Sequence, residues 1–367
     1  MEKKLGFGCM RLPMKGEEVD YDEFNKMIDY YIEQGFNYFD TAHGYIGGKS
    51  ETAIRDCLSA RYPRESFVLT DKLTAPYFNS KEDIRPFFES QLKLTGVEYF
   101  DYYLMHAQDK GNYPHFQKCE AYEVAQELKA EGKIKHFGFS FHGSPAYLTQ
   151  VLDAHPEVEF VQIQLNYADW ENPVVCSGQL YDILHKRNIP MIIMEPVKGG
   201  NLAKLRPELE DMYKAVRPNA SIASWALRFV ASLPGVMTIL SGMSTEDQMN
   251  DNIGTFTRFE PLSEDEKKLV DEVRKRMLDI PTIGCTACRY CTDGCPMHIS
   301  IPDVFKSVNT IRLYNEQFRP KNFYNNLIAS GNGRASECIG CGQCEGVCPQ
   351  HLPIIELLKE ASGMLDQ

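Results

Sequence analysis

Long hydrophobic runs are missing from this sequence. No stretch of about 18 or more apolar residues occurs, so no segment is expected to span a membrane. The first residues, MEKKLGFGCMRLP, lack the apolar core of a signal peptide, and we therefore expect a cytoplasmic protein. Positive charge is also in deficit. The sequence has 39 Lys and Arg residues against 51 acidic residues, which gives a net charge of −12. That charge argues against nucleic acids and anionic membrane surfaces as main partners.

Cysteine is sparse over most of the chain and dense near its end. The first 280 residues hold four, at Cys9, Cys57, Cys119 and Cys176, whereas eight more occur from Cys285 to Cys348. We expect the scattered four to be small buried hydrophobic residues. In a cytosolic protein, such a concentration of thiols indicates a metal site more often than disulfides.

What the sequence does contain is a repeated pattern of strands and helices. With 43% hydrophobic and 25% charged residues, its 367 residues are typical of a globular protein with one large domain or two ordinary ones. Short β-rich runs alternate with amphipathic helical stretches, and these runs are 5–9, 37–40, 67–72, 100–106, 134–140, 160–166, 191–196 and 236–242. Such alternation predicts a parallel sheet, and repeats of about 30 residues match an α/β fold of the (β/α)8 TIM-barrel type. A doubly wound sheet is the alternative, which is weakened because no G-x-G-x-x-G follows the first run.

The end of the barrel pattern is marked by a predicted capped helix. Residues 262–277 read LSEDEKKLVDEVRKRM, with Ser263 as N-cap and Glu266 as its capping-box partner. The sequence DIPTIG then breaks the pattern before the cysteines begin. We place the domain boundary near Pro281, which gives a barrel over 1–280 and a second domain over 281–367.

Polar residues at the ends of consecutive strands form a candidate catalytic group. Asp40, Lys72 and His106 end the second, third and fourth runs, and Tyr45 follows Asp40 by five residues. Each alone has an ordinary explanation as a cap, a rim charge, a loop aromatic or a core histidine. Together they lie at the carboxyl ends of barrel strands, where barrel enzymes carry their active sites.

The chemistry of this group fits carbonyl reduction or the reverse alcohol oxidation. A tyrosine hydroxyl has an ordinary pKa of about 10, and a nearby ammonium lowers that pKa. A carboxylate paired with Lys72 keeps the amine charged and oriented. A histidine can bind the substrate carbonyl or share its proton, so Tyr45 is predicted to act as the general acid.

These motifs resemble the aldo-keto reductase family. FDTAHGYIGGKSE, DK at 71–72, YYLMH at 102–106, GFS at 138–140 and QIQLNY at 162–167 occur in that family's order and near its spacing. The resemblance implies a tetrad of Asp40, Tyr45, Lys72 and His106. It also implies NAD(H) or NADP(H) binding, with Ser140 and Gln162 at positions that contact the carboxamide.

The sequence departs from the family pattern around the cofactor. Phe141 replaces a common Asn, Met194 replaces the aromatic that stacks on nicotinamide, and Glu195 takes the place of a small residue, with Lys198 expected to offset its charge. Gly242 and Gln248 stand where basic residues would bind a 2′-phosphate, so we predict that NADH is favoured over NADPH. The full set of predicted cofactor contacts is Ser140, Gln162, Met194, Lys198, Ser241, Ser244, Thr245, Gln248 and Asn252.

The eight clustered cysteines form two identical boxes. Residues 285–296 and 338–349 both read C-x2-C-x2-C-x3-C-P. In this motif the fourth cysteine serves the cluster of the other box. The predicted ligand sets for two [4Fe–4S] clusters are therefore Cys285, Cys288, Cys291 and Cys348, and Cys338, Cys341, Cys344 and Cys295. Zinc is the weaker alternative, since zinc sites show pairs of C-x2-C.

The second domain resembles a bacterial-type ferredoxin. The 42 residues between Cys295 and Cys338 include the helical pattern 301–318, which favours the α-helical variety of that domain. Aldo-keto-reductase-like proteins with such a C-terminal module form a recognisable group, which this chain resembles along its length.

Three interpretations of the combined domains stay open. The first is a reductase or dehydrogenase for a small carbonyl or alcohol substrate, with clusters that support the structure. In the second, the clusters relay single electrons between a ferredoxin or flavoprotein partner and a substrate in the barrel. The third is a binding or electron-transfer module without turnover, against which the intact tetrad argues. No flavin signature occurs, although a barrel can bind FMN without one. We favour an oxidoreductase.

Overall fold

The computed structural model describes residues 3–366, which form two compact units. The first contains the chain up to Gly200 together with Ala223–Val270. The second contains Asn201–Ile222 together with the chain from Asp271 onward. A segment that follows a barrel strand in the sequence is therefore part of the same compact unit as the cysteine boxes.

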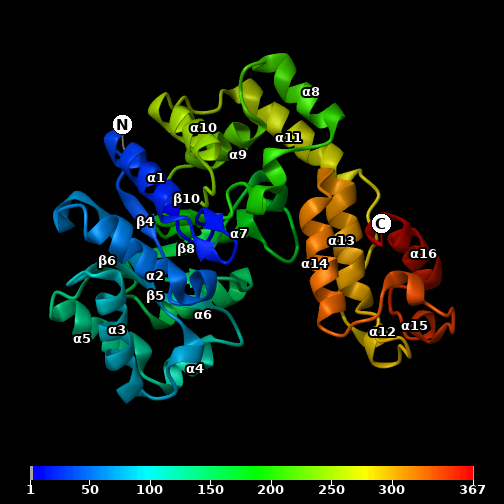
Figure 1. The fold of residues 1–367 in the computed structure, drawn as a ribbon, viewed down its shortest axis with the longest axis horizontal. Helices are drawn as coiled ribbons and strands as arrows, with labels where there is room; N and C mark the ends of the chain where they lie inside the picture. The colour runs from blue at the N-terminus through cyan, green and yellow to red at the C-terminus, as the bar shows by residue number, and fades with distance from the viewer. Residues whose placement is uncertain (1–2, 367) are drawn as a thin grey trace. The chain divides into compact units, whose positions relative to one another are not determined.

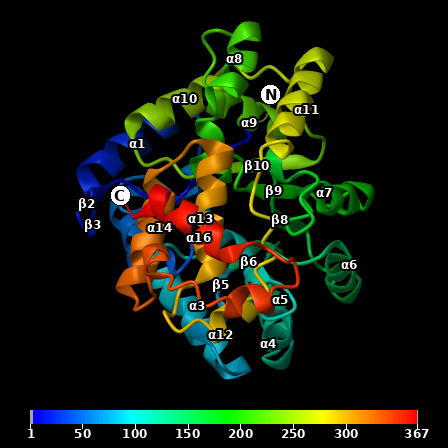
Figure 2. The ribbon, with the colours of Figure 1, turned by 90° about the vertical axis from the view of Figure 1, so that its right-hand side faces the viewer.

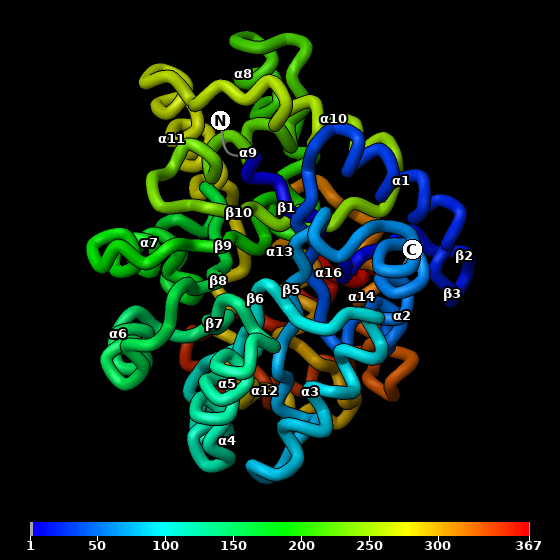
Figure 3. The backbone as a smooth tube through the Cα atoms, turned by 90° about the vertical axis from the view of Figure 1, so that its left-hand side faces the viewer, coloured from blue at the N-terminus to red at the C-terminus, as the bar shows by residue number. Residues whose placement is uncertain are grey.

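The first unit is built around a closed barrel of parallel strands, which Figure 3 shows surrounded by helices. Its strands are β1 (Leu5–Gly8), β4 (Tyr38–Asp40), β5 (Val68–Leu73), β6 (Phe100–Gln108), β7 (Ile134–Phe141), β8 (Phe160–Gln164), β9 (Met191–Met194) and β10 (Val236–Ser241). Each strand pairs with its neighbours in sequence order, and β1 pairs with β10 to close the ring. The predicted barrel and all eight predicted runs are confirmed. A small hairpin, β2 (Met14–Lys15) with β3 (Glu18–Val19), precedes the first helix.

Amphipathic helices cover the barrel because each has one apolar face. In α1 (Tyr21–Glu33), four residues at helical spacing are buried, namely Phe24, Met27, Ile28 and Tyr31, and the side chain of Asp20 caps the start by accepting from the Glu23 amide at 3.2 Å. The other helices of this part of the chain are α2 (Lys49–Ile54), α3 (Lys81–Thr95), α4 (Tyr113–Lys118), α5 (Ala121–Ala130), α6 (Pro145–Ala154), α7 (Ser177–Lys186), α9 (Ile222–Ala231) and α10 (Glu246–Thr257).

The predicted capping box begins α11 (Glu264–Leu278), which Figure 1 labels near the top of the picture. The Ser263 amide donates to Glu266 Oε2 at 2.8 Å, and the Glu266 amide donates to Ser263 Oγ at 3.2 Å. The Glu266 carboxylate also pairs with the buried guanidinium of Arg228 in α9, at 2.8 Å. One side chain therefore both caps α11 and ties it to α9.

The second unit is helical around its own core. Its helices are α8 (Pro207–Val216), α12 (Tyr290–Asp293), α13 (Ile301–Tyr314), α14 (Phe318–Ala329), α15 (Gln343–Gly346) and α16 (Ile354–Leu365). Helices α13, α14 and α16 lie side by side in Figure 2 and bury Phe305, Val308, Tyr324 and Leu358. The helical pattern predicted between the boxes corresponds to α13, which ends where Asn315 takes a left-handed conformation.

Within residues 3–366, no helix combines the length and the apolar character needed to cross a membrane.

Candidate active site and cysteine-lined hollows

Three strands and one turn bring the predicted tetrad to one rim of the barrel. Asp40 is the last residue of β4, and Lys72 and His106 lie near the ends of β5 and β6. Tyr45 opens a short 3-10 turn, η1 (Tyr45–Gly48), in the loop after β4. The residue after Tyr45, Ile46, has a φ of +54°, so this turn is held in a conformation that non-glycine residues rarely adopt.

A buried ion pair forms the base of this site. Lys72 Nζ donates to Asp40 Oδ1 at 2.7 Å and to the carbonyl of Thr41 at 2.6 Å. Burial lowers the pKa of Lys72, but the charge of Asp40 and the neighbouring Tyr45 raise it above its ordinary value overall. Burial raises the pKa of Asp40, which the ammonium partly offsets. The lysine is therefore a fixed positive charge at neutral pH.

Tyr45 lies beside that charge. Lys72 Nζ is 4.9 Å from the centre of the Tyr45 ring. Burial raises the pKa of the Tyr45 hydroxyl above its ordinary value, and the nearby ammonium of Lys72 offsets part of that rise. The ammonium thus acts in the predicted direction, but burial has the larger effect. Tyr45 carries its proton at neutral pH, as a general acid requires.

His106 completes the group as a neutral imidazole. Burial, together with the positive charge of Lys72, lowers its pKa to about 3. Its ring centre is 6.2 Å from that of Tyr45, and its Nδ1 shares a hydrogen bond of 2.8 Å with the hydroxyl of Thr74. Because Thr74 occupies Nδ1, a ligand in the site would meet Nε2. Sequence reasoning missed Thr74, although its position two residues after Lys72 at a strand end was a signal.

The two predicted carboxamide contacts are register partners on adjacent strands. Ser140 of β7 lies opposite Gln162 of β8. Ser140 Oγ accepts from the Ala107 amide at 2.7 Å, and Gln162 Nε2 donates to Met194 Sδ at 3.5 Å. Gln162 Oε1 is buried and has no hydrogen-bond partner among the described residues. A buried acceptor without a donor fits the amide N–H of a nicotinamide.

The structure after β9 contradicts the expectation that Lys198 offsets the charge of Glu195. Lys198 Nζ pairs with Asp169, not with Glu195. The cation near Glu195 is Arg11, whose Nη2 lies 3.8 Å from Glu195 Oε1. Gly199 has a φ of +62°, and a Cβ there would approach Arg11 Nη2 to 3.3 Å. Arg11 lies three residues after the end of β1, so its place near the rim was readable from the sequence but was missed.

The predicted cofactor contacts after β10 bond mainly to one another. Ser241 Oγ accepts from Asn252 Nδ2 at 2.8 Å. The Ser244 amide donates to Gln248 Oε1 at 2.8 Å, and Thr245 is the N-cap of α10, accepting from the Gln248 amide at 3.3 Å. Phe141, at the family's Asn position, is 1% exposed, and its ring packs 6.1 Å from that of Phe139. It is a core residue and not a ligand contact.

The eight clustered cysteines divide between two hollows. One is bordered by Cys285, Cys288, Cys291 and Cys348, and the other by Cys295, Cys338, Cys341 and Cys344. Each hollow therefore joins thiols of both boxes in the combination predicted from the spacing. Among the described residues, no three His, Cys, Asp or Glu side chains converge tightly enough for a single metal ion. Four soft sulfur ligands around a wider space fit an iron–sulfur cluster.

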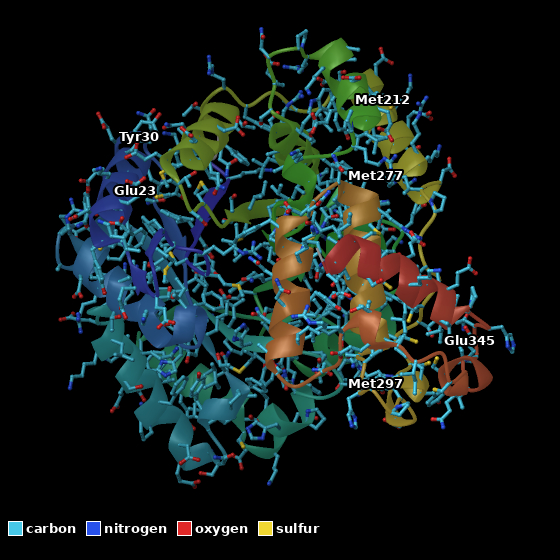
Figure 4. The ribbon with its side chains drawn as sticks, turned by 45° about the vertical axis from the view of Figure 1, so that its right-hand side comes forward. Glu23, Tyr30, Met212, Met277, Met297 and Glu345 are labelled. Atoms are coloured by element: carbon cyan, nitrogen blue, oxygen red, sulfur yellow. The ribbon has the colours of Figure 1, made fainter. Side chains whose placement is uncertain are left out.

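Besides the cysteines, the walls of both hollows are mainly apolar. Met297, labelled in Figure 4, borders the second hollow together with Ile299, Ile339 and Leu358. The first hollow has Arg289 in its wall, and the guanidinium of that residue contacts Asp303 at 3.1 Å. Cys288 and Cys341 are exposed, so one thiol of each set reaches the protein surface.

Comparisons with known proteins agree with both parts of the chain. A model of the aldo/keto reductase family matches residues 4–275, and a model of the 4Fe-4S dicluster domain matches residues 284–352. An L-galactose dehydrogenase of Arabidopsis thaliana is 25% identical over 283 residues, which cover 72% of this chain and 88% of the relative. An NADH-specific methylglyoxal reductase of Escherichia coli is 27% identical over 259 residues, covering 60% and 78%.

Solved structures share the barrel fold. The holo form of the aldo-keto reductase AKR11C1 from Bacillus halodurans superposes with a TM-score of 0.59 at 24% identity, over 74% of this chain and 91% of that one. An aldo-keto reductase from Klebsiella pneumoniae in complex with NADPH gives a TM-score of 0.60 at 20% identity, over 74% and 90%.

Proposed function

The chain belongs to the aldo/keto reductase family and is an oxidoreductase with a C-terminal 4Fe-4S dicluster domain, and from that premise we propose a reaction for its barrel. The barrel reduces a small carbonyl compound or oxidises the corresponding alcohol, with Tyr45 as general acid and base. The observation that carries the proposal is the buried pair of Lys72 and Asp40 beneath Tyr45. A fixed ammonium stabilises the phenolate that forms when Tyr45 gives up its proton.

A nicotinamide would supply the hydride when bound. The residues proposed to hold it are Ser140 and Gln162 at the carboxamide, with Arg11 and the loop after β9 near its phosphates. The neutral His106 would donate from Nε2 to the substrate oxygen, because Thr74 occupies Nδ1. Tyr45 would then pass its proton to the same oxygen as the alcohol forms.

Replacing Tyr45 by Phe tests this role. We expect kcat for aldehyde reduction to fall about a hundredfold or more, the usual contribution of a general acid, while cofactor binding stays the same. Tyr21→Phe is the matched control, since Tyr21 is 38% exposed at the start of α1. Full turnover by the Tyr45→Phe protein would remove Tyr45 from the mechanism. A wild-type protein that binds cofactor but turns over no carbonyl would instead support a module without turnover.

We propose that NADH is favoured over NADPH. Gln248 and Gly242 offer no cation to a 2′-phosphate, and Gln248 is already bonded to the Ser244 amide. The Escherichia coli relative is named NADH-specific, whereas the Klebsiella structure was solved with NADPH. Equilibrium binding of both cofactors tests the preference, and tighter binding of NADPH would contradict it. Gln248→Arg should raise the affinity for NADPH about tenfold, since a charge-assisted hydrogen bond contributes roughly 1.5–3 kcal/mol.

As a second candidate function, we propose that two [4Fe–4S] clusters, held by the two predicted ligand sets, relay electrons. The exposed thiols Cys288 and Cys341 favour this idea, because a cluster near the surface can exchange electrons with a ferredoxin or flavoprotein partner. Anaerobic protein should then show a reduced-cluster EPR signal after addition of NADH, with or without a copurifying flavin. Carbonyl reduction at an unchanged rate in Cys288→Ala and Cys341→Ala would indicate clusters with only a structural role.

A further inference from the structure

Two buried carboxyl groups behind the tetrad are not used by the proposed reaction. Glu51 lies on α2 and Asp71 on β5, and both are 0% exposed. Asp71 directly precedes Lys72, but alternate residues of a strand point to opposite faces. Its side chain therefore lies outside the barrel, where α3 packs against both α2 and β5 (Figure 1).

The hydrogen bonds around these carboxyl groups leave one oxygen without a donor. Glu51 Oε2 lies 2.6 Å from His43 Nδ1, and Glu51 Oε1 accepts from Gln91 Nε2 at 3.3 Å. Asp71 Oδ1 accepts from the Lys72 amide at 2.8 Å. Asp71 Oδ2 is buried and has no donor among the described residues. An ionised carboxylate only accepts, so two ionised groups would leave this oxygen unsatisfied.

Within the described part of the chain, no nearby cation can neutralise a double charge on Glu51 and Asp71. Lys72 Nζ is already engaged by Asp40 and the Thr41 carbonyl. The other groups that face the pair are His43, whose ring packs against Tyr77 and Phe87, and the Tyr103 hydroxyl, which donates to Gln91 Oε1 at 2.5 Å. Burial lowers the pKa of His43, so this ring is neutral at neutral pH. Two like charges in one buried space cannot both persist.

A side-chain hydrogen bond between Glu51 and Asp71 also contributes to their pKa values, lowering that of Glu51 and raising that of Asp71. A carboxyl–carboxyl hydrogen bond requires a proton on one partner. A proton at Asp71 Oδ2 or on Glu51 would satisfy the remaining oxygen and remove one charge. The donor count and the burial thus lead to the same conclusion.

We propose that Glu51 and Asp71 share one proton and act as a positioning pair for Tyr45 and Lys72. His43, bonded to Glu51, lies two residues before Tyr45, and Asp71 lies one residue before Lys72. The pair therefore fixes the loop that carries Tyr45 against the strand that carries Lys72. This role rests on the proposed carbonyl reduction, whereas the shared proton itself does not.

The pH dependence of turnover separates this pair from the tetrad. Burial raises the pKa values of both Glu51 and Asp71. The charge of Glu51 raises the pKa of Asp71 further, whereas the hydrogen bond with Asp71 offsets part of the rise at Glu51. Tyr45 and Lys72 titrate above their ordinary values, and His106 titrates far below neutral pH. We expect turnover to fall as the pH rises above neutrality, because the pair then loses its shared proton. This fall should occur at a lower pH than the ionisation of Tyr45.

Infrared difference spectroscopy of the full-length protein tests the shared proton directly. At pH 8, the wild type should show the carbonyl stretch of a buried protonated carboxyl group, and both Asp71→Asn and Glu51→Gln should lack it because an amide replaces the proton as donor. Asp101→Asn is the control. Asp101 is buried, but it accepts hydrogen bonds from Arg64, Lys135 and the Leu69 amide. The Asp101→Asn protein should therefore still show the band. A wild-type spectrum without the band would overturn the inference.

Kinetics of the same variants test the positioning role. Asp71→Asn should keep kcat within about threefold and lose the alkaline fall, whereas Asp71→Leu, which cannot donate, should lower kcat about tenfold or more at similar KM. Glu51→Gln should behave like Asp71→Asn and replaces it if that variant fails to fold. Equal kcat in the Asn and Leu variants would overturn the positioning role. Failure of the proposed function would appear separately, as a wild type without turnover whose infrared band is still present.

Discussion

Electrostatics at the scale of single residues sets the protonation of the candidate site. Lys72 is charged, Tyr45 keeps its proton and His106 is neutral, because burial acts on each and only Lys72 has a carboxylate partner close by. The site is thus prepared to donate a proton and to hydrogen-bond an oxygen.

The bond between Thr74 and His106 gives a prediction about the imidazole tautomer. Thr74→Val removes the hydroxyl from Nδ1 with little change in shape, so the ring loses its fixed orientation and tautomer. We expect kcat/KM for carbonyl reduction to fall about tenfold, and nitrogen NMR of labelled histidine should show mixed tautomers. Thr74→Ser should restore both. Unchanged kinetics in the valine variant would mean that His106 is oriented by other contacts.

The buried acid pair also predicts how stability depends on pH. Because the pKa values of Glu51 and Asp71 are raised on folding, the native state binds more protons than the unfolded state above a pH of about 4. Stability should therefore fall as the pH rises toward the native pKa values, by at most about 1.4 kcal/mol per pH unit for each proton. Urea unfolding at several pH values should show a shallower fall for Asp71→Asn than for the wild type. Parallel curves would contradict a protonated pair.

At the scale of secondary structure, the capped start of α11 shows how one residue stabilises two elements. Glu266 caps its own helix and pairs with the buried Arg228 of α9. The cap follows from the place of Glu266 in the first turn of α11. Sequence reasoning found the cap but not the ion pair, which depends on how the helices pack.

Removing the Glu266 carboxylate should destabilise the protein strongly. Glu266→Ala leaves the charge of Arg228 buried, with an expected loss of about 3–5 kcal/mol in the free energy of unfolding. Glu264→Ala, in the same turn, removes only an exposed pair with Lys267 and should cost less than about 1 kcal/mol. Urea denaturation of both variants makes the comparison. Equal small losses would mean that Arg228 finds another partner.

At the scale of the whole molecule, one compact unit contains the candidate tetrad and the other contains the two cysteine boxes. The segment Asn201–Ile222 belongs to the second unit although it follows β9 in the sequence. Within that unit, Arg319 Nη2 donates to Asn201 Oδ1 at 2.8 Å, and Arg206 Nη1 donates to the Arg312 carbonyl at 3.3 Å. A segment between two barrel strands is thus bonded to the helices α13 and α14.

The crossed ligand sets make a prediction for the whole C-terminal domain. Cys295→Ser lies in the first box but should remove the cluster of the second box, lowering bound iron from about eight to about four atoms per chain. Cys291→Ser should remove the other cluster, and the two variants should keep different EPR signals. Cys119→Ser, at a buried thiol of the first unit, is the control and should not change the iron content. Loss of the same signal in both box variants would refute the crossed sets.

The sequence by itself determined the order of strands and helices, the closed barrel and the spacing of both cysteine boxes, because these depend on local patterns of apolar, turn and ligand residues. It also placed the tetrad, since the carboxyl ends of parallel strands meet at one rim. Only the tertiary structure decided that Arg11 and not Lys198 faces Glu195, that Thr74 holds His106, and that Glu51 meets Asp71. Those contacts join side chains from different elements, and their partners depend on packing distances that no local pattern encodes.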